Sequence, residues 1–241
     1  GAVKNAGRAE RNGRRPAITD SADVTELEGN ADDDSTLATS ALDALAASGP
    51  DLNLDADGGG GTLSASNLTA GQITVDGTGQ DDTFTFNELT SSNTTITLNA
   101  ANIITLSGDV IAASDLTISN VNSDVNIGNG ISLTATSGSV TANDNVALID
   151  LTGTSKNTIT AGTNVSLTAI TDSANVTELE VNADDDITLS TITLDALATS
   201  ILDINLDADG GRRTLSARNL TAGQITVDGT GQGDPFTLHE S

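Results

Sequence analysis

The chain has 241 residues and a formal net charge of −25, from 34 acidic and nine basic side chains. It contains no Cys, Met, Trp or Tyr and three Phe, so Ile, Val, Leu and Ala must build its core. Nucleic acid and anionic membrane surfaces are disfavoured as partners because they repel this charge. The lack of Cys excludes disulfides and thiolate metal sites. This composition predicts a thin interior of stacked aliphatic side chains.

The N-terminal segment 1–17 holds five of the nine basic side chains and no apolar run, unlike a secretory signal peptide. It weakly matches the segment 152 positions later. We therefore expect 1–17 to be a diverged, Arg-rich edge of a repeat. No stretch of the chain approaches the apolar length that membrane insertion requires.

Residues 18–88 return as residues 170–240, with 54 of 71 positions identical. This identity indicates an internal duplication with an offset of 152 positions, a first repeat at 18–169 and a truncated second repeat at 170–241. The chain has no initiator Met and stops within the second repeat, so we expect it to be a fragment of a longer protein.

Strand-like segments recur inside the repeat about every 30 residues. They begin at Thr25, Leu52, Phe84, Leu116, Ala147, Thr177, Ile204 and Phe236. Apolar and polar residues alternate in them, as in "DINLDADGG" at 203–211, and Gly, Asn and Asp separate them. The pattern predicts an all-β fold, a right-handed parallel β-solenoid of about eight rungs of roughly 30 residues, about five of them in the first repeat. The alternative is a row of tandem β-sandwich repeats, which the missing Tyr and Trp disfavour.

The segment "STLATSALDALAASG" at 35–49 is rich in Ala and compatible with a helix. Its counterpart at 187–201 has Ile187 and Ile192 where the first copy has Ser35 and Ser40. β-branched residues favour strands. If both copies share one fold, strands are expected in both.

The sharpest candidate for a ligand site is "NLDADGG", which occurs once in each copy. Its candidate metal ligands are Asn53, Asp55 and Asp57 in the first copy and Asn205, Asp207 and Asp209 in the second. The pattern matches the first half of a calcium-binding loop, but the twelfth position is Ser64 or Ser216 where an EF-hand has Glu. The alternative is a strand with solvent-facing acids that ends in a glycine turn.

Other acidic segments are weaker candidates. "DGTGQDDTF" at 76–84 resembles a calcium-binding Gly/Asp turn, but Asp81 is replaced by Gly233 in the second copy, so a plain turn is expected. The Asp triplets at 32–34 and 184–186 either form solvated turns or hold a cation loosely.

The predicted rung alignment also groups acids into columns along the solenoid. It places Asp150, Glu180 and Asp207 in one outward column and Glu28 beside Asp55. Like charges at this spacing repel, so the columns are expected to need screening by salt or bridging by calcium.

Units such as "SDVNIGNGISLTATSGSVTAND" (123–144) and "NTITAGTNVSLTAITDSANVTELEVNADDDITLS" (157–190) resemble the rungs of large bacterial surface exoproteins. These include filamentous-haemagglutinin-type and autotransporter passengers and giant repetitive adhesins. The resemblance covers the chain from about Ile18 onward and lies in style and composition. It implies an extracellular or cell-surface structural protein whose shaft holds a binding tip away from the cell.

We expect a structural shaft segment without catalytic activity. It would associate with itself through its rung ends or through neighbouring repeats, and the parent protein would bind an unidentified cell-surface or matrix ligand. The alternatives are a calcium-binding adhesive module, with calcium as its cofactor, and a polysaccharide-processing β-helix enzyme. The enzyme is disfavoured because Lys156 is the one base between Ile18 and Gly211 and the sole His, His239, cannot complete a Ser/His/Asp set.

Overall fold

The structure is a computed structural model of the chain. It describes residues 3–9, 13–15, 24–31, 35–37, 40–42, 51–56, 62–77, 82–142, 148–152, 155–172, 177–193, 203–208, 215–218, 220–221, 224–228 and 236–239. These residues form 28 β-strands and no helix. The prediction of an all-β chain is confirmed.

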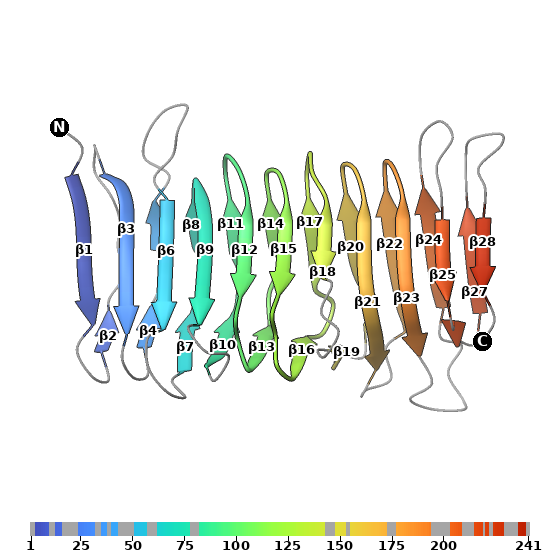
Figure 1. The fold of residues 1–241 in the computed structure, drawn as a ribbon, viewed down its shortest axis with the longest axis horizontal. Helices are drawn as coiled ribbons and strands as arrows, with labels where there is room; N and C mark the ends of the chain where they lie inside the picture. The colour runs from blue at the N-terminus through green and yellow to red at the C-terminus, as the bar shows by residue number, and fades with distance from the viewer. Residues whose placement is uncertain are drawn as a thin grey trace.

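The strands stack in a row along the longest axis of the molecule, from β1 near the N-terminus to β28 near the C-terminus (Figure 1). Each pairing among the described strands is parallel and joins segments one turn of the chain apart. The chain is therefore a parallel β-solenoid, as predicted, and the sandwich alternative is excluded. Its pairings define three faces.

The first face consists of β1 (Val3–Ala9), β3 (Val24–Ala31), β6 (Asp51–Ala56), β9 (Gln72–Gly77), β12 (Ile96–Asn99), β15 (Leu116–Ser119), β18 (Val140–Ala142), the beginnings of β21 (Val165–Asp172) and β23 (Ile187–Thr193), β25 (Leu215–Arg218) and β28 (Phe236–His239). The second face consists of β2 (Gly13–Arg15), β4 (Ser35–Leu37), β7 (Thr62–Ala65), β10 (Thr83–Phe86), β13 (Ile103–Leu106), β16 (Asp124–Ile127), β19 (Leu148–Leu151), the ends of β21 and β23, and β26 (Leu220–Thr221). Because β21 and β23 turn the corner between them, these two faces form one sheet.

The third face is a separate sheet of nine strands. It consists of β5 (Ser40–Leu42), β8 (Leu68–Ala70), β11 (Leu89–Ser91), β14 (Val110–Ala112), β17 (Ser132–Ala135), β20 (Asn157–Ala161), β22 (Glu178–Ala183), β24 (Asp203–Ala208) and β27 (Gln224–Asp228). The chain thus passes the three faces in turn as it winds along the axis.

One turn of the solenoid is shorter than the sequence pattern predicts. The chain completes a short turn between the paired residues Thr83 and Ile103 and a long turn between Ile187 and Leu215. No other described pairing has a smaller sequence separation than the first or a larger one than the second. The predicted rung of about 30 residues is therefore too long. The number of rungs differs from the prediction for the same reason, while the fold class stands.

The Ala-rich segment forms strands where the structure describes it. Ser35–Leu37 and Ser40–Leu42 are β4 and β5, and the counterpart Ile187–Thr193 is β23. The prediction of strands in both copies is confirmed for these residues. Residues 43–49 lie outside the described part of the chain.

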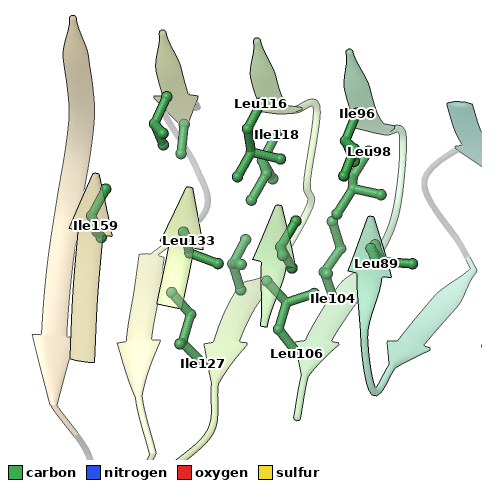
Figure 2. Close-up of a cluster of buried hydrophobic side chains, with 14 of the residues drawn as sticks. Leu89, Ile96, Leu98, Ile104, Leu106, Leu116, Ile118, Ile127, Leu133 and Ile159 are labelled. Atoms are coloured by element: carbon green, nitrogen blue, oxygen red, sulfur yellow. The ribbon is translucent and has the colours of Figure 1, made fainter. Parts of the chain in front are cut away.

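Alternation with a period of two builds the core. On β9, Ile73 and Val75 are buried while Gln72, Thr74 and Asp76 are partly exposed. Buried side chains from the three faces meet along the axis, as Figure 2 shows for Leu89, Ile96, Leu98, Ile104 and Leu106. Because each turn repeats this pattern, the same inward position is filled from one turn to the next. One such column on the first face consists of the register partners Ile73, Ile96, Leu116, Val140, Val165 and Ile187.

Asp and Asn side chains fasten the corners between faces. Asp109 Oδ1 accepts a hydrogen bond from the backbone N–H of Ser132 at 2.8 Å, and Asp115 Oδ1 accepts one from Ser139 at 2.8 Å. The side chains of Asn129 and Asn164 accept equivalent bonds, from the backbone N–H groups of Ser155 and Asp186. Each bond joins two successive turns. The polar corner residues therefore satisfy backbone donors that no strand pairing reaches.

Candidate functional site

The structure places four of the six candidate metal ligands on strands. Asn53 and Asp55 lie on β6, on the first face, and Asn205 and Asp207 lie on β24, on the third face. Asp57 and Asp209 lie outside the described residues. The described parts of the two candidate segments, 53–56 and 205–208, are thus strands, and they belong to different faces of the solenoid.

Strand register brings a second acid next to each candidate Asp. Asp55 pairs with Asp76 on β9, and Asp207 pairs with Asp228 on β27. Paired backbones of neighbouring strands lie about 4.8 Å apart. Asp76 begins the weaker candidate turn at 76–84, and Asp228 is its counterpart in the second copy, but the sequence did not predict that these two acids pair with Asp55 and Asp207. Among the described residues, the candidate site is therefore an arrangement of acids on two neighbouring strands.

The side chain of Asp76 also takes part in a polar chain along the first face. Its Oδ1 accepts a hydrogen bond from Asn99 Nδ2 at 3.0 Å. Asn99 Oδ1 in turn accepts bonds from Ser119 Oγ at 3.0 Å and from Asn120 Nδ2 at 2.6 Å. Carboxylate and amide oxygens such as these are the ligands that calcium prefers.

The predicted column of acids is wrong. Asp150 lies on β19 of the second face, where it pairs with Asn126 and Thr171. Glu180 lies on the third face beside Thr158 and Asn205. The reason is that the rungs are shorter than predicted, so segments that look equivalent in sequence fall on different faces.

The two remaining pairings involve Asp207 and Glu28. Asp207 pairs with Asn182 and Asp228. Glu28 pairs with Asn53 and not with Asp55, whose neighbour on the same side is Asn30. Asp207 therefore shares the third face with Glu180 but stands in a different column.

Lys156 forms an ion-pair cluster with two glutamates of β22. Its Nζ lies 2.7 Å from Glu180 Oε2 and 3.2 Å from Glu178 Oε1. The hydrogen bond to Glu180 raises the pKa of Lys156 above its ordinary value, against the lowering effect of burial, and Glu178 adds to the increase. The single base between Ile18 and Gly211 thus neutralises acids on the third face.

The Asp184–Asp186 triplet forms the corner after β22. The backbone N–H of Asp184 donates to the carbonyl of Ala161 at 3.1 Å, and that of Asp185 donates to Thr163 at 2.8 Å. The side chains of Asp184 and Asp186 are exposed. Among the described residues, no group of three or more Asp, Glu, His or Cys side chains is placed to hold a metal ion. The first-copy triplet at 32–34 lies outside the described residues.

Two buried polar residues were missed by the sequence analysis. Asp82 is 2% exposed, and its counterpart Asp234 is retained in the second copy although Asp81 is not. Asn157 is 1% exposed; its Nδ2 donates to the carbonyls of Gly128 at 2.9 Å and Ile131 at 3.4 Å. Retention in both copies is the signal that marks Asp82. Asn157 fastens the corner before β17, and its identity is shared with Asn5 in the weakly matching N-terminal segment.

Comparisons with known proteins identify no relative: no family model, curated protein or solved structure matches this chain. In the part of the chain that the structure describes, no helix has the length and hydropathy of a membrane span.

Proposed function

We propose that the chain is a structural shaft segment of an extracellular or cell-surface repetitive fibre, without catalytic activity of its own. The observation that carries this proposal is the unbroken stacking of parallel strands on three faces (Figure 1). Each turn rests on the previous one through backbone hydrogen bonds and through the same inward columns. Such a fold gains length by adding turns and keeps a constant cross-section.

The surface composition supports this assignment. Thr side chains recur on the outward positions of the first face, where Thr74, Thr97, Thr117 and Thr141 are register partners. The exposed acids keep the rod soluble and disfavour nucleic acid and anionic membranes as partners. The resemblance to surface exoproteins supports the extracellular or cell-surface location and a cell-surface or matrix ligand for the parent protein.

Chains lengthened by whole repeats would test the shaft proposal. Each further copy of residues 18–169 should lengthen the particle by roughly 30 Å at constant cross-section, because turns stack about 4.8 Å apart. Small-angle scattering on chains with one, two and three added repeats measures both dimensions. A cross-section that grows with repeat number, or separate globular beads in electron micrographs, would contradict the proposal. Cleavage of polysaccharide by the chain would overturn its non-catalytic part.

Self-association through the ends of the solenoid belongs to the same proposal. Among the described strands of the first face, β1 pairs with β3 and β28 pairs with β25, so each leaves one edge to pair with another chain. In the scattering series, the apparent length should therefore rise with protein concentration while the cross-section stays constant. Growth of the cross-section with concentration would indicate lateral association instead.

Calcium binding is the second candidate function. The register pairs Asp55–Asp76 and Asp207–Asp228 favour it, because the same two acids become neighbours in both copies of the repeat. A calcium ion between them would offset the repulsion of two carboxylates. Thermal melts with added calcium, in the native chain and in a chain with Asp207→Asn and Asp228→Asn, test this function.

A further inference from the structure

The two copies of the repeat share one local structure. In the first copy, Glu26 pairs with Asp51 and Asp51 pairs with Gln72. In the second copy the residues 152 positions later form the same pairs: Glu178 with Asp203 and Asp203 with Gln224. The pairing of Ser35 with Leu63, of Ser40 with Leu68 and of Leu63 with Phe84 is reproduced in the same way, at Ile187–Leu215, Ile192–Leu220 and Leu215–Phe236.

The copies nevertheless occupy different faces. Residues 26–31 and 51–56 belong to the first face, whereas their counterparts 178–183 and 203–208 belong to the third. Residues 63–65 belong to the second face and their counterparts 215–217 to the first. Every strand whose counterpart is also described is displaced from it by one face in the same direction.

We infer that the repeat does not contain a whole number of turns, so that successive copies are related by a screw that rotates by one face about the rod axis. Three faces close one turn, so the rotation is one third of a turn. A segment can move from one face to the next because each face requires the same alternation of small polar and apolar residues. The turns between the two duplicated segments determine the face on which the second segment begins. The strand pairings within the segment are the same on either face.

This geometry deepens the proposed shaft function, on which its consequence rests. A surface carried by the repeat, such as the acid pair Asp55–Asp76 and its counterpart Asp207–Asp228, lies on the first face of the rod in one copy and on the third face in the next. A cationic partner attracted by these acids would meet successive copies on successive sides. A flat partner would face one copy at a time, whereas a partner that wraps the rod could contact them all.

Disulfide trapping in the full chain tests the rotation, and the native chain has no Cys to interfere. The informative position is Thr158, which lies just before the second copy, in the stretch 153–169 that weakly matches the N-terminal segment 1–17. In the structure, Thr158 is the register partner of Ser132 on the third face. Without rotation, Thr158 would lie on the first face, as its counterpart Ala6 does, in the column that contains Thr141. Cysteines on paired strands lie within disulfide reach.

Two double variants therefore separate the alternatives: Ser132→Cys with Thr158→Cys, and Thr141→Cys with Thr158→Cys. We expect the first pair to oxidise almost completely to an intramolecular disulfide and the second to stay reduced, as measured by thiol alkylation and peptide mass spectrometry. Cross-linking of the second pair, or of neither, would overturn the rotation.

Two control pairs report the local structure that both alternatives share: Thr36→Cys with Ser64→Cys, and Thr188→Cys with Ser216→Cys. Failure of both controls would contradict the fold itself. If only the shaft proposal is wrong, the scattering series will show it, and the cysteine pairs will still cross-link as expected.

Discussion

At the scale of single residues, the corners carry the local strain of the fold. Among the described residues other than glycine, Asn67, Ala100 and Asn120 adopt the left-handed backbone region, with φ of 55°, 55° and 53°. Asn tolerates this region because its short polar side chain bonds locally. Ala100 has a Cβ and no polar group to compensate. Its corner is therefore the one that glycine would relax.

Replacing Ala100 with Gly should leave the free energy of unfolding unchanged or raise it by up to about 0.5 kcal/mol, since relief of the left-handed strain of roughly 1 kcal/mol offsets the added entropy of the unfolded chain. The matched control is Ala101→Gly. Ala101 is buried and its φ is not positive, so its replacement should cost about 1 kcal/mol. Urea unfolding of both variants measures the difference. Equal losses at the two positions would contradict the assigned strain.

The Lys156 cluster gives a residue-scale prediction that depends on pH. Lys156→Gln should lower the free energy of unfolding by about 0.5 kcal/mol at neutral pH, a small effect because the lysine side chain is 41% exposed. Because the pKa of Lys156 is raised in the folded state, its charge stabilises the fold at any pH below the pKa of the unfolded chain, about 10.4. This stabilisation is lost as the pH rises through the pKa of the folded state. The difference between variant and native chain should therefore vanish in alkaline solution.

Thermal melts at neutral and at strongly alkaline pH measure this change. Lys156→Arg retains the charge and serves as the control, with little loss at either pH. A loss in Lys156→Gln that persists unchanged at alkaline pH would show that the lysine acts through packing of its aliphatic stem and not through its charge.

At the scale of the structural elements, stability depends on how closely one corner stacks on the next. A Cβ at Gly108 would overlap the backbone carbonyl of Asn87 on the preceding turn. Backbone atoms cannot move aside as a flexible side chain can. Glycine is therefore required at this corner by the close approach of two turns, while Gly130, with φ of 71°, is required by its backbone conformation.

Gly108→Ala should consequently destabilise the chain by about 2–3 kcal/mol, because the two turns must separate to admit the methyl group. Gly130→Ala should cost only about 1 kcal/mol, since its Cβ would meet nothing nearer than Ser155 Cβ at 3.7 Å and the cost is conformational. Chemical unfolding of the two variants compares them directly. A larger loss at Gly130 would contradict the stacking argument.

The strands themselves could be predicted from sequence, but the face to which each belongs could not. Alternation with a period of two marks Phe84 and Leu116 as strand positions, and both lie on strands. More than one turn separates them, however, so they lie on the second and first faces. Alternation has the same period on every face, so it does not reveal where the chain turns a corner. The corners depend on tertiary contacts between Gly, Asn and Asp residues of successive turns.

The candidate site was predicted in part for the same reason. The acids of "NLDADGG" are visible as a motif. In the structure, Asp55 lies on a strand that pairs with the strand of Asp76, and Asp207 lies on a strand that pairs with the strand of Asp228. Their partners Asp76 and Asp228 come from the following turn. Locating them requires the length of a turn, and the length inferred from the sequence was too great. The predicted grouping of Asp150 with Asp207 failed because of that error.

At the scale of the whole molecule, the acids set the conditions under which the rod is stable. The 34 carboxylates are opposed by nine bases. Two like charges about 5 Å apart repel by roughly 1 kcal/mol in water and about 3 kcal/mol at an effective dielectric constant near 20. The paired acids Asp55–Asp76 and Asp207–Asp228 bring this repulsion to neighbouring turns. Salt relieves it by screening and calcium by bridging, and the two mechanisms respond differently to substitution.

If calcium binds, millimolar calcium should raise the melting temperature more than sodium at matched ionic strength. The gain corresponds to about 1.4 kcal/mol at a concentration tenfold above the dissociation constant. Asp207→Asn with Asp228→Asn should remove the part of the gain that comes from the second copy. Glu88→Gln with Asp184→Asn removes the same number of charges from two exposed positions and should retain the full gain. Equal gains from sodium and calcium in the native chain would show that the acids are only screened and would exclude a specific calcium site.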